Sequence, residues 1–407
     1  PLIGRKPFIA AWNAPLDRCT TRYNISTNVE RLFHIQGSPR AEWTGQNITI
    51  FYANRLGFYP HYTPQGVAVN GGLPQNCSLD LHLLKAHQDI RRFIPARDVR
   101  GLAVIDWEFW RPQWKRNWHK KRIYQSRSVE LARSLNQWLP EEELVQLARG
   151  QFEDAARAFM DRTLSLGLRL RPSRLWGFYL FPDCYNYGWE EPGYTGRCSN
   201  KTQGQNDRLM WLWERSSALF PSVYIAESLG DSPFSKLYVR NRVQEAMRVA
   251  ELPRRPHTVP VYVYSRPLFR DQSSTFLSQM DLVSTVGEIA ALGASGVVMW
   301  GSSSDYSSKG QCESLSRYLK STLAPYLANV TAAAMLCSEV LCQGKGRCTR
   351  KEYDSTHYLH LNPAHFTISQ VEGAYVATGL PSAADVDALS QHFTCQCYAG
   401  LTCQARA

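Results

Sequence analysis

The chain has 407 residues, of which 44% are hydrophobic and 20% charged, and its formal net charge is +11. This length and composition are ordinary for a soluble globular protein with one large domain or two smaller ones. The positive charge indicates an anionic partner. The absence of any zinc-finger, RRM or helix-turn-helix pattern argues against nucleic acid and for an acidic polysaccharide or an anionic membrane surface. The alternative is that the charge only keeps the protein soluble.

Short apolar segments alternate with longer helical ones from the N-terminus to about residue 330. Their continuous apolar character is typical of strands buried on both faces, as in a parallel sheet. Strands are predicted at residues 7–13, 47–52, 102–108, 174–181, 222–226, 259–265 and 295–300.

The clearest predicted helix covers residues 141–170. Apolar residues recur there at spacings of four and three and form one face of the helix. They are Leu144, Ala148, Phe152, Ala155 and Phe159. Similar patterns predict helices within 206–220, 236–250 and 277–293. This alternation favours a doubly wound sheet or a β/α barrel.

The ends of the predicted strands favour the barrel. Nearly every strand closes on a polar or aromatic residue, and a β/α barrel gathers the carboxyl ends of its strands on the face that holds the active site. These residues are Asn13, Tyr52, Asp106 with Glu108, Tyr179, Tyr224, Tyr264 and Trp300. No G-x-G-x-x-G turn marks the switch point of a doubly wound sheet. We therefore expect an α/β fold with a TIM-like barrel at 1–330, of which seven strands are visible.

Cysteines and glycosylation sequons indicate an oxidising compartment. Of the 11 cysteines, six lie near the C-terminus: Cys337, Cys342, Cys348, Cys395, Cys397 and Cys403. They predict a small disulfide-rich module at 331–407, and six half-cystines allow fifteen connectivities. The N-x-S/T sequons are Asn24, Asn47, Asn76, Asn200 and Asn329.

The sequence opens at Pro1 without a signal peptide, as expected for the mature portion of a larger protein, and no apolar run is judged long enough to span a bilayer. An extracellular, cell-surface or luminal protein is therefore expected. A GPI or membrane anchor beyond Ala407 would attach it to the cell surface.

Asp106 and Glu108 are the candidate catalytic residues. Side chains alternate along a strand, so both carboxyls point the same way while Trp107 points opposite, with Cα atoms roughly 6 to 7 Å apart. Like charges that close disfavour double ionisation, so one acid should hold its proton at a raised pKa, as in a glycosidase. The alternative is that strand-end acids meet only solvent or an arginine such as Arg111.

The residues around this pair strengthen the glycosidase interpretation. Aromatic rings at the other strand ends can stack on sugars, and Asn13 can bind sugar hydroxyls. A basic segment that follows the pair could guide a polyanion, although a solvated helix face is its default interpretation; it contains Arg111, Lys115, Arg116, Lys120, Lys121 and Arg122. There is no H-E-x-x-H, P-loop, G-x-S-x-G or ligand-spaced histidine cluster, so no metal and no cofactor are expected.

Several long motifs resemble one known family. "GLAVIDWEFWRPQWKRNW", "LWGFYLFPDCYNY", "GLPQN", "ALFPSVY" and "ALGASGVVMWG" are similar to the vertebrate hyaluronidases of glycoside hydrolase family 56, which also include the bee venom enzyme. The resemblance covers nearly the whole chain. "KPFIAAWNAP", "GSPR", "YVRNRV" and "CYAGLTC" place it nearest the sperm-surface branch and its close paralogue.

This resemblance implies a distorted β/α barrel followed by an EGF-like domain, and endo-hydrolysis of hyaluronan at β-1,4 bonds after N-acetylglucosamine. It makes Glu108 the general acid/base and Asp106 the residue that orients the acetamido nucleophile of the substrate. It also implies contacts with the sugars from Tyr179, Tyr224, Trp300, Asn13, Tyr52, Asp183, Tyr185, Tyr187 and Tyr264. An acidic residue of the cleft is expected near Arg270 and Asp271.

The family pattern also implies the disulfides Cys19–Cys312 and Cys184–Cys198. The EGF-like resemblance implies Cys337–Cys348, Cys342–Cys395 and Cys397–Cys403, with a long insert before Cys395. Cys77 is left as a thiol, with intermolecular pairing as the alternative.

The expected partners are hyaluronan and, more slowly cleaved, chondroitin, and a monomer is expected. Two other functions stay open: a chondroitin-directed hydrolase, and a glycan-binding or adhesion protein that cleaves little. Retention of both Asp106 and Glu108 argues against the second.

Overall fold

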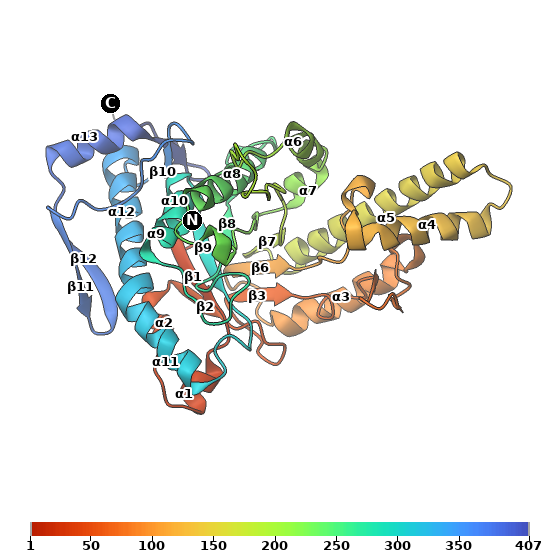
Figure 1. Cartoon of the computed structure of the whole chain (residues 1–407), viewed down its shortest axis with the longest axis horizontal. Coiled ribbons are helices and arrows are strands. Elements are labelled where there is room, and N and C mark those ends of the chain that lie inside the picture. Colours follow the sequence, from red (N-terminus) through yellow and green to blue (C-terminus); the bar gives the residue numbers. More distant parts are fainter. Residues whose placement is uncertain (1, 406–407) are drawn as a thin grey trace. The chain divides into compact units, whose positions relative to one another are not determined.

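The computed structural model describes residues 2–405, which cluster into two compact units (Figure 1). The first unit consists of Pro1–Arg40, Gln46–Ile48 and Leu180–Ala407, and the second of Ala41–Gly45 and Thr49–Tyr179. The second unit is thus inserted into the sequence of the first. Each unit is organised around a sheet of buried strands.

The elements of the first unit follow in chain order. They are β1 (Ile9–Asn13), α1 (Asp17–Thr21), α2 (Val29–Leu32), β2 (Ile35–Gly37), α6 (Asn200–Asp207), α7 (Met210–Arg215), the 3-10 turn η4 (Glu227–Leu229), α8 (Pro233–Ala250), β8 (Tyr262–Ser265), α9 (Gln279–Leu282), the π-helical turn η5 (Val283–Gly287), α10 (Glu288–Ala291), β9 (Gly296–Trp300), α11 (Lys309–Tyr318), the π-helical turn η6 (Leu319–Leu323), α12 (Ala324–Cys342), β10 (Gly346–Arg350), β11 (Phe366–Val371), β12 (Ala374–Gly379), α13 (Ala383–His392) and β13 (Phe393–Cys397).

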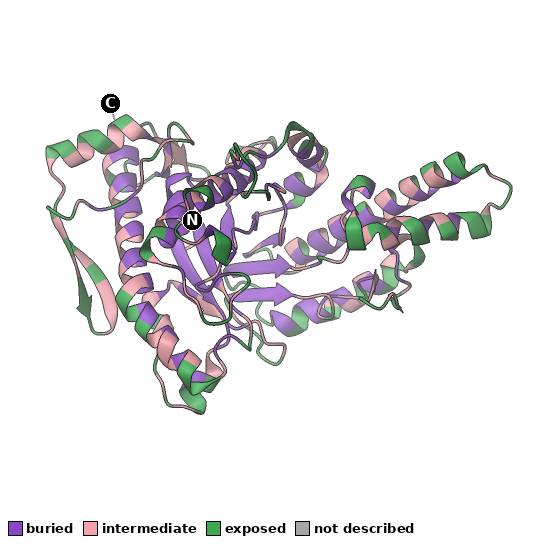
Figure 2. Ribbon diagram, in the orientation of Figure 1, coloured by how far each residue is buried: buried purple, intermediate pink, exposed green. Residues whose placement is uncertain are grey.

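The main sheet of the first unit is parallel, with the strand order β2-β1-β9-β8. Strands β1, β8 and β9 are apolar and nearly fully buried, as Figure 2 shows, whereas β2 is buried only at Ile35. Beyond β8, Leu219 and Ser222 make isolated parallel bridges to Val261 and Tyr264. This register brings the carboxyl ends of these strands to one edge.

The second unit contains a second sheet, with the order β3-β6-β7, and long helices. Its elements are β3 (Ile48–Phe51, clustered here from Thr49 onward), β4 (His61–Tyr62), β5 (Ala68–Val69), the 3-10 turn η1 (Pro74–Asn76), α3 (Leu79–Phe93), β6 (Gly101–Ile105), the 3-10 turns η2 (Trp114–Arg116) and η3 (His119–Lys121), α4 (Arg122–Leu135), α5 (Glu141–Leu170) and β7 (Arg174–Phe178). β6 and β7 run parallel.

Local sequence explains where the helices of this unit begin and what they bury. The side chain of Ser78 caps α3 by accepting the backbone N–H of Leu81, and α5 begins after Pro140 with three glutamates in its first turn. The buried face of α5 includes Ala156, whereas Ala155 of the expected set is only half-buried. In Figure 1, α4 and α5 form a long hairpin.

The predicted strands are found with two corrections. The segment 222–226 makes only an isolated bridge, and the strand predicted at 102–108 ends at Ile105. The short strand β2 was not predicted. The described strand pairings form two open parallel sheets and three antiparallel pairs, so a closed seven-stranded barrel stays a prediction.

The disulfides of the described chain are the five pairs that the resemblance implies. They are Cys19–Cys312, Cys184–Cys198, Cys337–Cys348, Cys342–Cys395 and Cys397–Cys403. Cys77 is a free thiol, half-buried against the carbonyl of Phe58. Four sequon asparagines are exposed and Asn329 is half-buried.

The C-terminal segment packs on a long helical run. α12 contacts β10, β12, α13 and β13 (Figure 1), and residue 330, the expected domain boundary, lies inside α12. By length and composition alone, the helical run Lys309–Cys342 is long and apolar enough to cross a membrane. This corrects the expectation that the chain contains no apolar run of that length. Half of its most apolar window is buried within the protein, and three of its cysteines form disulfides, as in a core helix.

A buried ion cluster ties this segment to the rest of the first unit. Glu288 of α10 accepts hydrogen bonds from Arg240 of α8 at 2.9 Å, Arg350 of β10 at 2.8 Å and the Tyr358 hydroxyl at 2.9 Å. The side chains of Glu288 and Arg350 are completely buried. Both arginines also donate to backbone carbonyls within residues 353–357. One carboxylate therefore balances two buried guanidinium groups.

We predict that Glu288→Gln lowers the free energy of unfolding by about 3 kcal/mol, because two buried arginines would lose the carboxylate with which both form ion pairs. The urea midpoint, followed by circular dichroism, measures the effect. Glu313→Gln is the matched control, since the Glu313 side chain is 45% exposed and its carboxylate lies 4.0 Å from the Lys309 ammonium. Equal midpoints for the two variants would contradict the prediction.

Candidate active site

Asp106 and Glu108 lie directly after β6 rather than within it. The Asp106 N–H still donates to the Phe51 carbonyl at 2.9 Å, and the Tyr179 N–H donates to the Ile105 carbonyl at 2.9 Å. Pairing with both neighbouring strands ends there. Trp107 is 3% exposed, while Asp106 is half-buried and Glu108 is exposed. The expected alternation therefore holds for the side chains, although the strand has already ended.

The two carboxyls do not ionise independently. Burial raises the pKa of Asp106 well above its usual range, and hydrogen bonding with Glu108 and the charge of Glu108 raise it further. Oδ1 of Asp106 is enclosed and has no hydrogen-bond partner among residues 2–405. The pair therefore retains a proton at pH values at which an ordinary aspartate is ionised.

Trp107 fixes the segment between the two acids. Its ring stacks on Tyr59, with centroids 4.6 Å apart and planes 4° apart, and contacts Phe178 and His82 at 5.5 Å each. His82 accepts the Phe58 N–H at 2.8 Å, and its other ring nitrogen lies 2.8 Å from the Thr163 hydroxyl. Burial lowers the pKa of His82 to about 4, so the ring is neutral and adds no charge beneath the acids.

The tryptophans that follow are core residues rather than a sugar platform. Trp110 is 2% exposed and donates its ring N–H to the Pro60 carbonyl at 2.8 Å. Trp110 and Trp114 pack edge-on against Phe152 of α5. The aromatic run therefore attaches the loop after β6 to the long helix.

The basic segment after the acids is largely turned inward. Arg116 is 1% exposed, and Arg111 donates to the Arg116 carbonyl at 2.8 Å and lies over the Trp118 ring. Nζ of Lys121 donates to the carbonyls of Glu108 and Phe109. Burial, and after it the charge of Arg111, lowers the pKa of Lys121 to about 8. The expected solvated helix face is wrong for these three residues, and no sequence pattern marks Lys121 as the residue that holds the loop of the acids.

Two tyrosines complete this group in the second unit. Tyr52 follows β3 and Tyr179 follows β7, so both stand beside Asp106 at the carboxyl end of the same sheet. Both side chains are half-buried, and the Arg55 guanidinium lies over the Tyr52 ring at 4.6 Å. The second unit thus brings together two acids and two phenol rings.

The first unit gathers a second group at the carboxyl ends of its own strands. Asn13 pairs in register with Trp300, and Tyr224 lies 6.1 Å from the Trp300 ring. Asn13 is completely buried, and neither its amide oxygen nor its amide nitrogen has a hydrogen-bond partner among the described residues. Tyr264 is 1% exposed, so its ring forms part of the wall behind this edge.

An ion pair that the sequence did not predict stands beside Trp300. Arg266 lies over the Trp300 ring at 5.7 Å and pairs with Asp305 at 2.8 Å. Both partners are nearly buried. Asp271, near the expected acidic cleft residue, accepts the backbone N–H of Glu227 at 2.8 Å. The polar loop after β9, "GSSSDYSS", is the sequence feature that could have identified Asp305 as a candidate site residue.

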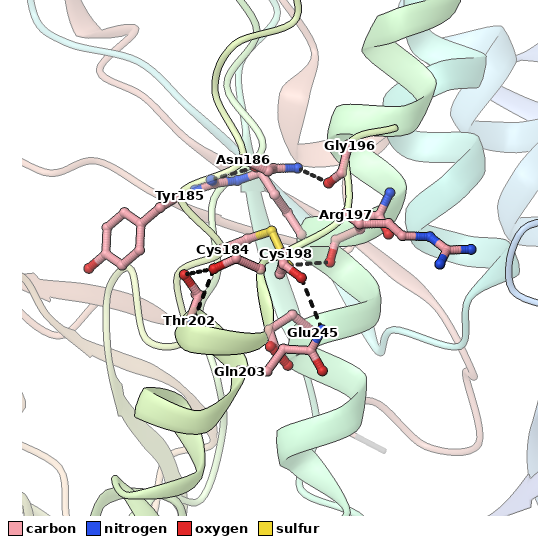
Figure 3. The surroundings of a disulfide bond; sticks show 12 residues. Cys184, Tyr185, Asn186, Gly196, Arg197, Cys198, Thr202, Gln203 and Glu245 are labelled. Carbon is pink, nitrogen blue, oxygen red and sulfur yellow. Dashed lines mark hydrogen bonds between the residues drawn. A yellow bond between two sulfur atoms is a disulfide. The ribbon is translucent and has the colours of Figure 1, made fainter. Parts of the chain in front are cut away.

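Asp183, Tyr185 and Tyr187 lie on the loop that the Cys184–Cys198 disulfide closes (Figure 3). Asp183 is buried, pairs with Arg242 at 3.0 Å and accepts the backbone N–H groups of Cys184 and Tyr185. Figure 3 shows the Tyr185 ring directed away from the disulfide. Tyr187 is 48% exposed, with Arg242 over its ring. The buried ion pair therefore holds a loop that presents two tyrosines.

Among the described residues, no group of three or more His, Cys, Asp or Glu side chains is placed to hold a metal ion. The polar residues at the strand ends are carboxyls, phenols and one amide. Such side chains can transfer protons and bind hydroxyl or amide groups of a sugar.

Comparisons with known proteins agree with this chemistry. The sequence model of the hyaluronidase family matches residues 1–407. The chain is 48% identical to human hyaluronidase-4 over 98% of its length and 83% of the relative's, and 50% identical to mouse hyaluronidase-5 over 100% and 77%. It is 47% identical to human hyaluronidase PH-20 over 100% and 80% of the two chains.

The fold is similar to that of solved structures of bee venom hyaluronidase. One has a TM-score of 0.67 at 32% identity and covers 79% of this chain and 99% of that one. A second, in complex with a hyaluronic acid tetramer, has a TM-score of 0.68 at 32% identity, covering 78% and 98%. The protein described here has a mixed α/β fold of this kind, and it belongs to the hyaluronidase family.

We predict that Lys121→Met lowers kcat by about 10- to 100-fold with a smaller change in KM, because the Glu108 loop loses the donor that holds its carbonyls. Steady-state hydrolysis of hyaluronan measures both constants. Lys120→Met is the control, because it removes the same charge from an exposed neighbour. Equal losses of activity in the two variants would show that the loss of positive charge is responsible, rather than the loss of the Lys121 hydrogen bonds to the Glu108 loop.

Proposed function

We propose that the protein is an endo-β-N-acetylhexosaminidase that hydrolyses the β-1,4 bonds of hyaluronan by a substrate-assisted, retaining mechanism. The observation that carries this proposal is the Asp106–Glu108 pair, which retains a proton after β6 in a chain of the hyaluronidase family. The complex of the bee venom relative with a hyaluronic acid tetramer supports hyaluronan as the polymer.

In the first step, the carbonyl oxygen of the substrate's acetamido group attacks the anomeric carbon while the bond to the leaving sugar breaks. Asp106 accepts the acetamido N–H and passes its own proton to Glu108, and Glu108 donates that proton to the leaving oxygen. The Asp106 carboxylate then stabilises the positive charge of the cyclic oxazolinium ion. Because the pKa of Asp106 is raised, the acid pair still holds the proton that this step consumes.

In the second step, a water molecule attacks the anomeric carbon and the ring of the intermediate opens. Glu108, now a carboxylate, takes the proton of that water, and the acetamido group is restored. Two inversions at one carbon retain its configuration. The mechanism needs no second carboxylate at the distance of a nucleophile, because the substrate supplies that group itself.

The other strand-end residues have binding roles in this proposal. Tyr179, Tyr224 and Trp300 would line the pocket for the N-acetylglucosamine ring, since aromatic faces stack on sugars. The remaining predicted contacts would follow the polymer on either side: Asn13, Tyr52, Asp183, Tyr185, Tyr187 and Tyr264. The unpaired amide of the buried Asn13 supports its role, because a buried polar group without a partner is costly unless a ligand satisfies it.

The finer features of the fold and the environment belong to the same proposal. We infer a distorted β/α barrel with an EGF-like domain after residue 330, supported by the similarity to bee venom hyaluronidase and by the disulfides among the last six cysteines. Five disulfides and four exposed sequons favour the secretory pathway, with the protein released or held at the cell surface. We infer a monomer.

We predict that Glu108→Gln lowers the rate of hyaluronan hydrolysis by about 10²–10⁴-fold while the affinity for the polymer stays close to that of the wild type. The amide keeps the shape of the side chain but can neither donate a proton to the leaving oxygen nor activate water. Turnover of defined oligosaccharides and binding to immobilised hyaluronan separate the two effects.

Asp106→Asn is the companion variant. It should also lose most of its activity, because the acetamido group loses the negative charge of the carboxylate that accepts its N–H and Glu108 loses its proton source. Substantial turnover by Glu108→Gln would show that the acid/base is another residue.

We predict that hyaluronan is cleaved faster than chondroitin, and that Tyr224→Gly lowers hyaluronan turnover about 10-fold or more relative to chondroitin turnover. The two polymers differ at the C4 hydroxyl of the amino sugar, and Tyr224 places a hydroxyl on a rigid ring beside Trp300. Tyr224→Phe, which keeps the ring, tests the hydroxyl alone. A wild-type protein that prefers chondroitin would refute this assignment and favour the chondroitin-directed alternative.

A further inference from the structure

A groove rich in arginine lies between α3 and α5, which pack against each other within the second unit (Figure 1). Two hollows form it. One, of about 410 Å³, is lined by Leu83, Leu84 and His87 of α3 and by Arg162 and Arg169 of α5, among others.

The second hollow, of about 450 Å³, shares His87 and continues past the end of α3. Its lining includes Arg91, Arg92 and Arg171. The arginine groove is defined here as these five arginines together with His87.

The positive charge of this groove is not neutralised locally. Arg91, Arg92, Arg162 and Arg169 are exposed, and none forms an ion pair in the part of the chain that the structure describes. This contrasts with the α4–α5 hairpin, where Arg127, Arg133 and Arg149 each pair with a glutamate. Two carboxyls lie close to it: Asp80 lines the first hollow, and the charge of Asp98 acts on Arg171.

The fold brings these like charges together through a buried arginine. Arg171 is 7% exposed and donates to the carbonyls of Ile94 at 2.6 Å and Leu170 at 2.6 Å, which joins the end of α5 to the end of α3. Burial, followed by the charges of Arg91 and Arg97, lowers the pKa of Arg171. Hydrogen bonds to backbone carbonyls hold Arg171 in place, so it cannot move away from Arg91 and Arg97. A bound anion would offset the repulsion between these positive charges.

The arginine groove lies at the opposite end of β6 from the acids. Arg171 follows α5 and precedes Arg174, which pairs with Gly101 at the amino end of β6, whereas Asp106 and Glu108 follow its carboxyl end. Five residues of strand separate the two ends, which corresponds to about 17 Å. A ligand in this groove would therefore be bound outside the catalytic site.

We propose that the arginine groove is an exosite that binds a chain of an anionic polysaccharide. Arginine suits carboxylate and sulfate groups because its planar guanidinium can donate two parallel hydrogen bonds. Leu83 and the 65% exposed Leu84 provide an apolar surface for the faces of sugar rings. The two adjoining hollows follow an extended ligand, whereas a flat lipid surface would not reach into them.

The choice of hyaluronan as a ligand rests on the proposed function. A polymer with a carboxylate on every second sugar can occupy the groove while another stretch of the same chain lies in the catalytic site. The second contact then becomes intramolecular, and the effective concentration of scissile bonds rises. Long chains should gain from the groove, and short oligosaccharides should not.

The test is the triple variant Arg91→Ser, Arg162→Ser and Arg169→Ser, which spares the buried Arg171. In the Glu108→Gln background, we expect its Kd for immobilised hyaluronan and chondroitin sulfate to rise about 10-fold, with a weaker dependence on salt. In the active protein, KM for high-molecular-weight hyaluronan should rise about as much, while kcat and KM for a hyaluronan octasaccharide stay unchanged.

The matched control is the triple variant Arg127→Ser, Arg133→Ser and Arg149→Ser, which removes the same charge from the hairpin. If it weakens polymer binding equally, net charge and not the groove is responsible, and the proposal is overturned. It is also overturned if the groove variant changes only binding to phosphatidylserine vesicles.

The two proposals can fail separately. A wild-type protein that cleaves no hyaluronan, but whose polysaccharide binding depends on the groove, refutes the proposed function and supports the exosite. Normal cleavage with no effect of the groove variant on polymers refutes the exosite alone.

Discussion

The burial of Trp107 is the interaction on which the candidate catalytic centre depends. Once this ring is stacked on Tyr59 and enclosed by His82 and Phe178, the residues on either side must turn outward. Those residues are Asp106 and Glu108. An apolar contact thus forces two carboxyls into proximity, although their charges repel. Because ionisation of both is unfavourable there, the pKa of Asp106 is raised and the pair retains a proton. Aromatic packing around Trp107 is therefore the reason that the two carboxyls lie close together and share a proton.

Much of the positive charge of the chain serves the interior rather than the surface. Arg116, Arg174, Arg242 and Arg350 are nearly completely buried, and Arg171 holds two helix ends together. Arg174 donates to the Leu102 carbonyl, Arg242 pairs with Asp183, and Arg350 pairs with Glu288. The net charge of +11 therefore overstates the positive charge that is exposed on the surface and available to a polyanion. Of the exposed charge, part is paired, as in the α4–α5 hairpin, and part has no ion-pair partner in the described chain, as at Arg91, Arg92, Arg162 and Arg169 of the arginine groove.

Sequence patterns predicted the apolar strands and helix α5 well, because burial on both faces or on one stripe leaves a direct mark on composition. The same reasoning placed Asp106, Tyr179 and Trp300 at strand ends. It could not find where β6 stops, since this depends on hydrogen bonds from Asp106 and Tyr179 to neighbouring strands.

Nor could sequence reasoning separate Lys121 from its exposed neighbour Lys120, because only the folded backbone turns one of them toward the Glu108 carbonyl. The Glu288 cluster was invisible for a similar reason. Its members are up to 110 residues apart in the chain, between Arg240 and Arg350, and no local pattern connects them.

The Cys19–Cys312 bond has a consequence for biosynthesis. Its partners are 293 residues apart, so at ordinary rates of translation Cys19 emerges about 15–60 s before the cysteine it must meet. Cys77, Cys184 and Cys198 all become available first. The inserted second unit, which carries Cys77, is completely synthesised within the same interval. Correct oxidation thus requires Cys19 to remain reduced, or to exchange out of premature pairings, until the ribosome has passed α11. A cell that exports this chain must therefore either delay the oxidation of Cys19 or supply disulfide isomerisation as well as oxidation.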